Sequence, residues 1–113
     1  MEITFADKTF GKLANDDRKL LKECGKLRAE KIKARLAQLR FATTLEDVRN
    51  LPGNYHELTG NRKGQWACDL DQPYRLILTP HSKPIPTNDH GQYVWLEITG
   101  IEVVGVINYH KEK

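Results

Sequence analysis

Two segments of alternating side chains, separated by a turn, constrain the fold of this chain more than any other feature. The segments Trp66–Leu70 and Tyr74–Leu78 flank the turn Asp71–Pro73. Because successive side chains of a strand point to opposite faces, the pattern predicts two adjacent antiparallel strands with one apolar face. Arg75 and Ile77 fall on the other face. The apolar face is formed by Trp66, Cys68, Leu70, Tyr74, Leu76 and Leu78.

Upstream of these strands the periodicity is helical. Glu2–Phe5 alternates and predicts a short first strand. A helix capped by Asp7 or Thr9 is expected to follow and to end at Gly25. A second helix is expected over Lys26–Arg40, with an apolar stripe on one side and basic residues elsewhere on its circumference. The short break at Gly25 predicts that the two helices pack as an antiparallel pair.

Downstream, Pro80–Gln92 contains three prolines and predicts a loop without regular structure. Tyr93–Tyr109 is rich in Val, Ile and aromatic residues and predicts a final strand, which Gly100 and Gly105 bend or bulge. The order of strand, two helices and several strands predicts an α+β fold, with a mainly antiparallel twisted sheet and the two N-terminal helices packed on one side. The length fits a single domain over residues 1–113.

Composition excludes several classes of protein. The chain contains no run of about 18 apolar residues that could span a membrane, and it begins without a signal-peptide pattern, so a cytoplasmic location is expected. Cys24 and Cys68 are expected to be buried, reduced thiols. The first 63 residues carry 14 Lys and Arg against 9 Asp and Glu. This asymmetry fits a polyanionic partner, and it fits a solvated helix face equally well.

Three residues suggest RNA cleavage through the 2′-hydroxyl of the RNA itself. This reaction needs a group that removes the hydroxyl proton, a group that protonates the leaving 5′-oxygen, and a cation for the phosphate. His56 and His110 can transfer protons near neutral pH, and Arg75 suits the phosphate oxygens. The alternative is that both histidines are surface or hydrogen-bonded scaffold residues.

Aromatic and basic residues near these positions could hold the RNA. Tyr109 and Tyr74 could stack on bases, although core packing is the more common role for a residue such as Tyr74. Regular alternation would place Tyr109 and His110 on opposite faces, so both serve one site only if the strand twists or frays there. Arg62 and Lys63 lie in a glycine-bounded turn and could bind phosphates or remain solvated. No paired metal-ligand spacing and no phosphate-binding glycine loop is present, so we expect neither a metal site nor a cofactor.

The chain resembles the HigB toxins of the RelE/ParE superfamily, which include the plasmid maintenance system killer proteins. The resemblance spans nearly the whole chain and rests on three motifs in the same order: GNYHELTGNRKGQW, PYRLIL and a C-terminal INYH. It implies a RelE-like fold and a type II toxin-antitoxin toxin. Such a toxin is a metal-independent, ribosome-dependent mRNA endonuclease (an mRNA interferase) that inhibits translation by cleaving mRNA in the ribosomal A site.

The resemblance also implies partners and residue roles. The partners are a helix-turn-helix (HigA-like) antitoxin, the ribosome and mRNA, with operator DNA reached only through the antitoxin and no membrane. His56 and His110 are expected to transfer or orient protons, Arg75 to bind the scissile phosphate and Tyr109 to contact a base. The expected RNA-binding residues are Arg62, Lys63, Tyr74 and Asn108.

Two positions depart from the family pattern and keep alternatives open. Thr59 stands where the family often has a lysine, and Asn108 stands where it usually has an acidic residue. One alternative is a gyrase-inhibiting toxin of the ParE branch. Another is a catalytically decayed toxin that acts as an antitoxin-binding co-repressor.

Overall fold

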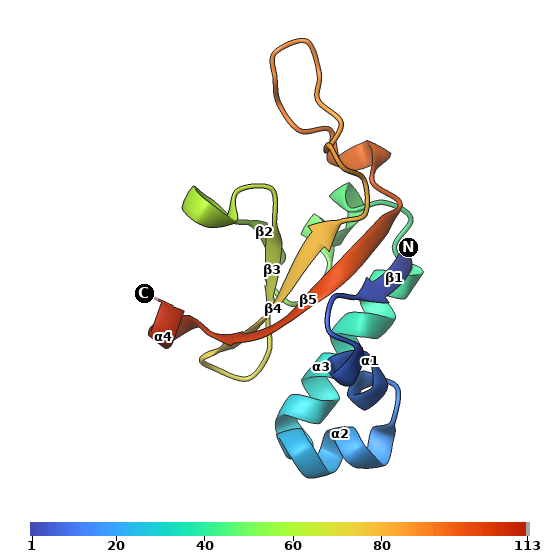
Figure 1. The fold of residues 1–113 in the computed structure, drawn as a ribbon, viewed down its shortest axis with the longest axis vertical. Helices are drawn as coiled ribbons and strands as arrows, with labels where there is room; N and C mark the ends of the chain where they lie inside the picture. The colour runs from blue at the N-terminus through green and yellow to red at the C-terminus, as the bar shows by residue number, and fades with distance from the viewer. Residues whose placement is uncertain (113) are drawn as a thin grey trace.

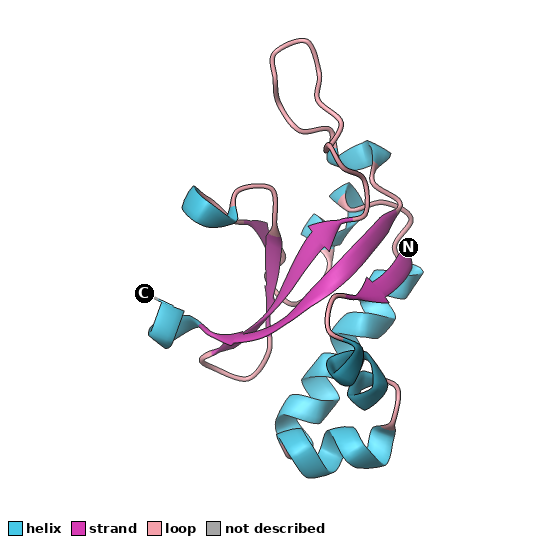
Figure 2. Cartoon of the chain, in the orientation of Figure 1, coloured by secondary structure: helices cyan, strands magenta, loops and turns pink. Residues whose placement is uncertain are grey.

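The computed structural model describes residues 1–112, with side chains described for residues 1–110. A five-stranded sheet forms the centre of the molecule, and the N-terminal helices gather at one side of it (Figures 1 and 2). The strands are β1 (Glu2–Phe5), β2 (His56–Glu57), β3 (Trp66–Asp69), β4 (Tyr74–Pro80) and β5 (Gly100–Asn108). The α-helices are α1 (Lys8–Ala14), α2 (Asp17–Cys24), α3 (Lys26–Phe41) and α4 (Tyr109–Glu112). The 3₁₀ helices are η1 (Glu46–Asn50), η2 (Gly60–Arg62) and η3 (Trp95–Glu97).

The strands lie in the order β1-β5-β4-β3-β2. β1 pairs with β5 in parallel, and the other neighbours are antiparallel. The parallel pair joins the two ends of the chain, since Glu2 lies opposite Gly100 and Phe5 opposite Val103. The predicted α+β class with a mainly antiparallel sheet is confirmed.

The prediction of one helix before Gly25 is wrong, because the chain breaks after Ala14 and forms α1 and α2. The carboxylate of Asp7 caps α1 by accepting a hydrogen bond from the Thr9 N–H at 2.8 Å. The carboxylate of Asp16 caps α2 in the same way, accepting from the Lys19 N–H at 3.1 Å. Each cap satisfies an N–H group that would otherwise lack a partner at the start of a helix. The N-terminal region therefore contains three helices and not two, and α2 runs across the end of α3 (Figure 1).

Helix α3 packs against one face of the sheet and closes the core. It extends one residue beyond the predicted end, to Phe41, and it buries Ile32, Leu36 and Leu39. The predicted apolar face of β3 and β4 is confirmed, because its side chains join the same hydrophobic cluster. The sheet residues of this cluster include Trp66, Cys68, Leu76, Leu78, Ile101 and Val103.

A β-bulge in β5 changes which of its side chains face the core. Leu78 lies opposite Val103 whereas Ile77 lies opposite Gly105, so β5 carries one extra residue at this point. Beyond the bulge, Val106 packs on the core and Ile107 faces the other side of the sheet. Gly105 has a φ of 153°, a conformation that favours glycine, and the predicted bulge at this residue is confirmed. The prediction of a strand from Tyr93 is wrong, because Trp95–Glu97 forms η3 and β5 begins only at Gly100.

The segment from His81 to Gln92 is a long, largely exposed loop that projects beyond the sheet (Figure 1), as predicted. Both cysteines are free thiols; Cys68 is buried, whereas Cys24 is only partly buried, contrary to the prediction. Among residues 1–112, no helix combines the length and the apolar composition that a membrane crossing requires.

Candidate functional site

A hollow of about 350 Å³ lies on the face of the sheet that α3 does not cover. Cross-strand pairing explains its position, since His56, Ala67, Ile77 and Gly105 are successive partners across β2, β3, β4 and β5. Ala67 and Gly105 are small and leave space on this row. Eleven residues line the hollow: His56, Glu57, Leu58, Thr59, Asn61, Arg62, Ala67, Arg75, Ile77, Ile107 and Tyr109.

His56 enters the hollow from β2 with a defined ring orientation. Its Nδ1 lies 2.6 Å from the backbone carbonyl oxygen of Asn54. A carbonyl oxygen can only accept a hydrogen bond, so Nδ1 must carry the hydrogen. In the neutral imidazole Nε2 is then the basic nitrogen, which makes it the atom that can remove a proton.

Arg75 lies on β4 directly opposite Asp69 of β3. Its Nε is 3.3 Å from Asp69 Oδ1, and both side chains are about one-fifth exposed. The Tyr109 ring covers the guanidinium, with 3.8 Å between Cζ and the ring centroid. An ion pair through Nε and an aromatic ring on one face fix the orientation of the guanidinium, and the terminal nitrogens Nη1 and Nη2 are the groups suited to phosphate oxygens.

The chain turns sharply after β5, which brings Tyr109 over Arg75. The Tyr109 N–H donates to the carbonyl oxygen of Pro73 at 2.9 Å. The side chain of Asn108 accepts a hydrogen bond from the His110 N–H at 3.1 Å and so caps α4. Since α4 begins at Tyr109, the strand alternation expected for Tyr109 and His110 does not extend to them. His110 is exposed, and its ring centroid lies 5.9 Å from that of Tyr109.

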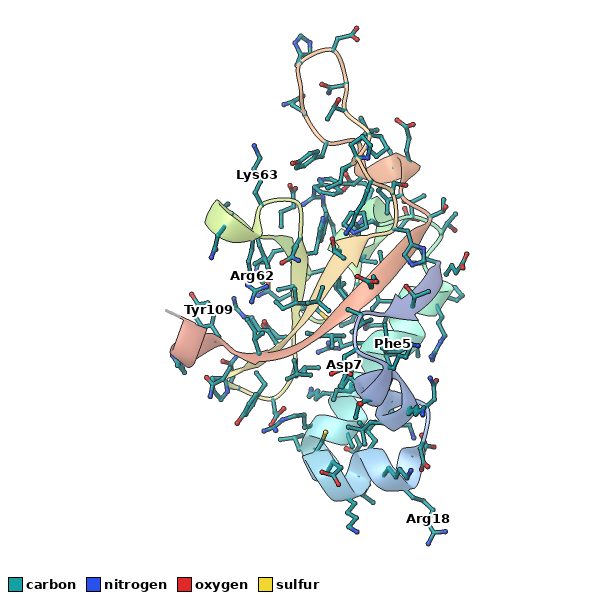
Figure 3. The ribbon with its side chains drawn as sticks, viewed as in Figure 1. Phe5, Asp7, Arg18, Arg62, Lys63 and Tyr109 are labelled. Atoms are coloured by element: carbon teal, nitrogen blue, oxygen red, sulfur yellow. The ribbon has the colours of Figure 1, made fainter. Side chains whose placement is uncertain are left out.

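Arg62 borders the hollow from η2, on the same side of the molecule as Tyr109 (Figure 3). One of its terminal nitrogens donates to Gln65 Oε1 at 3.1 Å. Gly60, at the start of η2, has a φ of 64°, so this tight turn uses a conformation that glycine adopts without strain. The hollow therefore holds two guanidinium groups, one imidazole and one phenol ring.

The remaining predicted site residues lie elsewhere. Lys63 points away from Arg62 (Figure 3) and lies 5.8 Å from the ring centroid of Tyr93 in a neighbouring hollow. Tyr74 packs on the core side of the sheet beneath the guanidinium of Arg28, at 3.5 Å. Asn108 and His110 do not line the hollow; one caps α4 and the other is exposed beside it.

Sequence reasoning missed two residues that contact this site. Asp69 forms an ion pair with Arg75, and the backbone carbonyl oxygen of Asn54 accepts a hydrogen bond from His56 Nδ1. The only local signal was the Pro52–Gly53–Asn54 sequence, which is typical of a turn, and Asn54 indeed has a φ of 53°. The contacts of Asp69 depend on partners from distant segments and left no signal in the sequence.

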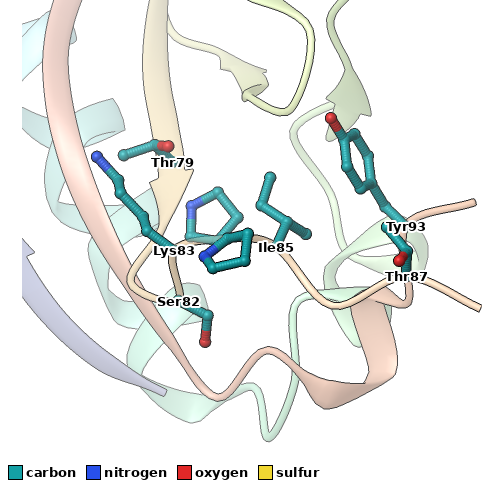
Figure 4. Close-up of a pocket in the computed structure, with 8 residues that line it drawn as sticks. Thr79, Ser82, Lys83, Ile85, Thr87 and Tyr93 are labelled. Atoms are coloured by element: carbon teal, nitrogen blue, oxygen red, sulfur yellow. The ribbon is translucent and has the colours of Figure 1, made fainter. Parts of the chain in front are cut away.

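A second hollow, of about 520 Å³, lies at the base of the projecting loop (Figure 4). Lys83 is the one charged residue among the eight that line it, and no histidine or carboxylate accompanies it. It is larger than the hollow at His56 but contains no imidazole, the group that most readily transfers protons near neutral pH. Within the described part of the chain, no three His, Cys, Asp or Glu side chains are grouped so that they could hold a metal ion.

Comparison with known proteins supports the fold. No protein-family model and no curated protein matches the chain. A chain of the YoeB–YefM complex from Staphylococcus aureus superposes with a TM-score of 0.55 and 18% sequence identity, over 94% of this chain and 93% of that chain. The two chains share one fold. The RelE-like α+β fold that the sequence motifs predicted is therefore confirmed.

Proposed function

We propose that this chain is the toxin of a type II toxin-antitoxin system, of the HigB type within the RelE/ParE superfamily, and that it cleaves mRNA in the ribosomal A site without a metal. One observation carries the proposal: His56, Arg62, Arg75 and Tyr109 come from four different elements and line one hollow. These four side chains provide the base, the cations and the aromatic surface that RNA cleavage requires.

The bonds and protons of the reaction can be assigned to these groups. Nε2 of His56 removes the proton from the 2′-hydroxyl, and the 2′-oxygen forms a bond to the adjacent phosphorus. The bond from phosphorus to the 5′-oxygen breaks, and His110, which lies outside the hollow beside Tyr109, donates the proton that this oxygen takes up. The products are a 2′,3′-cyclic phosphate and a 5′-hydroxyl.

Arg75 acts on the charge that develops on the phosphate. Its Nε is held by Asp69, so Nη1 and Nη2 are fixed before the substrate arrives and can bind two phosphate oxygens. Arg62, which lines the hollow from η2, binds a neighbouring phosphate. Tyr109 keeps Arg75 in place by covering its guanidinium and contacts a base beside the cleaved bond.

An antitoxin partner agrees with the structural comparison. The similar chain from Staphylococcus aureus comes from a complex of two proteins, YoeB and YefM. A site that cleaves mRNA must be masked while the cell grows, so we propose that a helix-turn-helix antitoxin binds this chain tightly. Purification of the chain with its neighbouring gene product tests this partner directly.

The cleavage test is inducible expression followed by mapping of mRNA ends. Wild type is expected to stop growth and to create new ends within codons, whereas His56→Ala and Arg75→Ala are expected to prevent both effects. His90→Ala and Arg18→Ala are the matched controls, because His90 lies on the projecting loop and Arg18 on α2 at the far end of the molecule (Figure 3). Both controls should cleave like wild type.

The same experiment distinguishes the other functions. Growth arrest with a DNA damage response and intact mRNA would identify a gyrase inhibitor instead. Normal growth with soluble wild-type protein would leave only the co-repressor role, and in either case the proposed RNA cleavage would be wrong.

A further inference from the structure

Asp69, the last residue of β3, connects helix α3, a turn and the candidate site. Its N–H donates to the carbonyl oxygen of Gly53 at 2.8 Å, and its own carbonyl accepts from Arg35 Nε at 2.8 Å. Its carboxylate Oδ2 accepts from the side-chain Nδ2 of Asn54 at 3.2 Å, while Oδ1 lies 3.3 Å from Arg75 Nε. The backbone N–H, the backbone carbonyl oxygen and the two carboxylate oxygens of Asp69 therefore each contact a different residue.

Asn54 contacts both sides of the candidate site. Its Nδ2 holds the carboxylate of Asp69, and that carboxylate pairs with Arg75. Its backbone carbonyl lies 2.6 Å from His56 Nδ1. The proposed base and the proposed phosphate-binding group are thus linked through one residue that does not itself line the hollow.

We propose that Asn54 is a positioning residue that sets, through two separate contacts, the tautomer of His56 and the orientation of Arg75. The carbonyl selects the imidazole with hydrogen on Nδ1, which leaves Nε2 basic. The amide fixes the Asp69 carboxylate, which in turn fixes the Arg75 guanidinium. The roles of His56 and Arg75 in cleavage rest on the proposed function, whereas the two contacts of Asn54 do not.

A buried arginine keeps the turn at Asn54 in one conformation. Arg35 of α3 is only 8% exposed, and a Cβ on Gly53 would lie 2.6 Å from its Nε. Gly53 has a φ of 121°, so the turn follows a path that only glycine takes easily at this position. Asn54, with a φ of 53°, is one of the few residue types that tolerate this conformation.

The carboxylate of Asp69 also depends on this arrangement. Its Oδ1 is buried and has no hydrogen bond among the described residues, so the ion pair with Arg75 is its compensation. Removal of the Asn54 amide would free Oδ2 and allow the carboxylate to rotate, and Arg75 would lose a fixed partner. A displacement of about 1 Å at a reacting group can lower a rate on the order of 100-fold.

Three substitutions separate the two contacts. Asn54→Gly keeps the left-handed backbone and the carbonyl near His56 but removes the amide. Asn54→Ala removes the amide and also disfavours the backbone conformation, so it is expected to disturb both contacts. Asp69→Asn removes the charge that holds Arg75 while leaving the shape of the side chain nearly unchanged.

Nuclear magnetic resonance of the chain without RNA measures the contacts directly. The ring nitrogen signals report the His56 tautomer, and the Nε–H signal of Arg75 reports whether its guanidinium is held. Wild type is expected to show hydrogen on Nδ1 and a protected Arg75 signal. Asn54→Gly and Asp69→Asn should keep the tautomer and lose the Arg75 signal, whereas Asn54→Ala should lose both.

Cleavage of mRNA on purified ribosomes gives the second measurement. Asn54→Gly and Asp69→Asn are expected to cleave on the order of 100-fold more slowly than wild type, and Asn54→Ala more slowly still. Asn15→Gly is the matched control, because the Asn15 amide donates to the Gly11 carbonyl at 2.8 Å at the end of α1, away from the hollow. It should lose a similar hydrogen bond and cleave like wild type.

The outcomes separate this inference from the proposed function. If wild type does not cleave mRNA, the proposed function fails, and the resonance measurements still decide whether Asn54 positions both groups. Unchanged His56 and Arg75 signals in all three variants would overturn the inference. So would wild-type cleavage rates in Asn54→Gly and Asp69→Asn when the wild type is active.

Discussion

The bulge in β5 should be essential for the site, and Gly105→Ala tests this. Gly105 has a φ of 153°, and a Cβ added there would meet no atom within 4 Å, so the cost comes from the backbone alone. An L-residue in this region costs about 2 kcal/mol. For a chain of this length that corresponds to a fall in Tm of roughly 8 °C.

The strain can be relieved if β5 slides by one residue and the bulge disappears. Val106 would then lie opposite Arg75, and Ile107 would turn toward the core, because a one-residue shift exchanges the faces of a strand. Tyr109 would no longer be placed over Arg75. We therefore expect Gly105→Ala to lose cleavage activity beyond what its lower stability explains.

Gly25→Ala is the matched control. Gly25 has a φ of 80° and likewise no atom within 4 Å of an added Cβ, but it lies between α2 and α3, away from the hollow. Urea unfolding followed by fluorescence of the buried residues Trp66 and Trp95 should give a similar loss of stability for both variants. If the two variants are equally destabilised and cleave mRNA equally fast, the bulge does not set the geometry of the site.

Three further predictions concern the site, the core and alkaline stability. Arg75→Lys keeps the charge but loses the two-nitrogen fork, so mRNA cleavage on ribosomes should fall about 100-fold, and equal rates would contradict the proposed role. Ile32→Ala should lower the free energy of unfolding in urea by about 3 kcal/mol, whereas Lys33→Ala, on the exposed side of α3, should change it by less than about 0.5 kcal/mol. Burial raises the pKa of the Cys68 thiol to about 12 and also raises the pKa of the Tyr55 hydroxyl. The folded chain therefore retains protons that the unfolded chain releases, so stability is unaffected well below pH 9, and it falls by roughly 1.4 kcal/mol per pH unit above about pH 9 for Cys68 and above about pH 10 for Tyr55. Cys68→Ala should reduce this slope in unfolding curves measured between pH 9 and 11, and an unchanged slope would contradict the assignment to Cys68.

Local periodicity was sufficient to predict much of the fold. The alternation around Arg75 assigned the two faces of β4 correctly, since Leu76 and Leu78 pack on the core while Arg75 faces the hollow. The end of α3 was predicted within one residue because its apolar stripe stops at Leu39. Both features depend on neighbours that are close in the sequence, which is the information that a pattern contains.

Other features depend on contacts that a pattern does not contain. The apolar stripe continues from Leu13 to Leu20, so the break between α1 and α2 was missed, and only the capping carboxylate of Asp16 marks it. The parallel pairing of β1 with β5 joins residues about 100 positions apart. Neither strand alone indicates its partner, because pairing depends on where the intervening helices place β1.

The candidate site likewise combines residues that the sequence predicted with residues that it did not. His56, Arg75 and Tyr109 were selected from residue types and motifs, and the structure places them around one hollow. The position of His110 outside it follows from the turn that begins α4. Asn54 was not selected, because an asparagine in a turn gives no sign that its amide binds Asp69 and its carbonyl oxygen accepts a hydrogen bond from His56.

The loop from His81 to Gln92 is a suitable place to insert a label. It leaves the sheet after Pro80, and at about 3.4 Å per residue of strand its base lies roughly 17 Å from Arg75. A fluorescent or affinity label spliced in near Asp89 would be displayed in solvent without altering either chain end. Such a labelled protein would allow the ribosome binding that the proposed function requires to be timed on single ribosomes, while the residues that line the hollow stay unchanged.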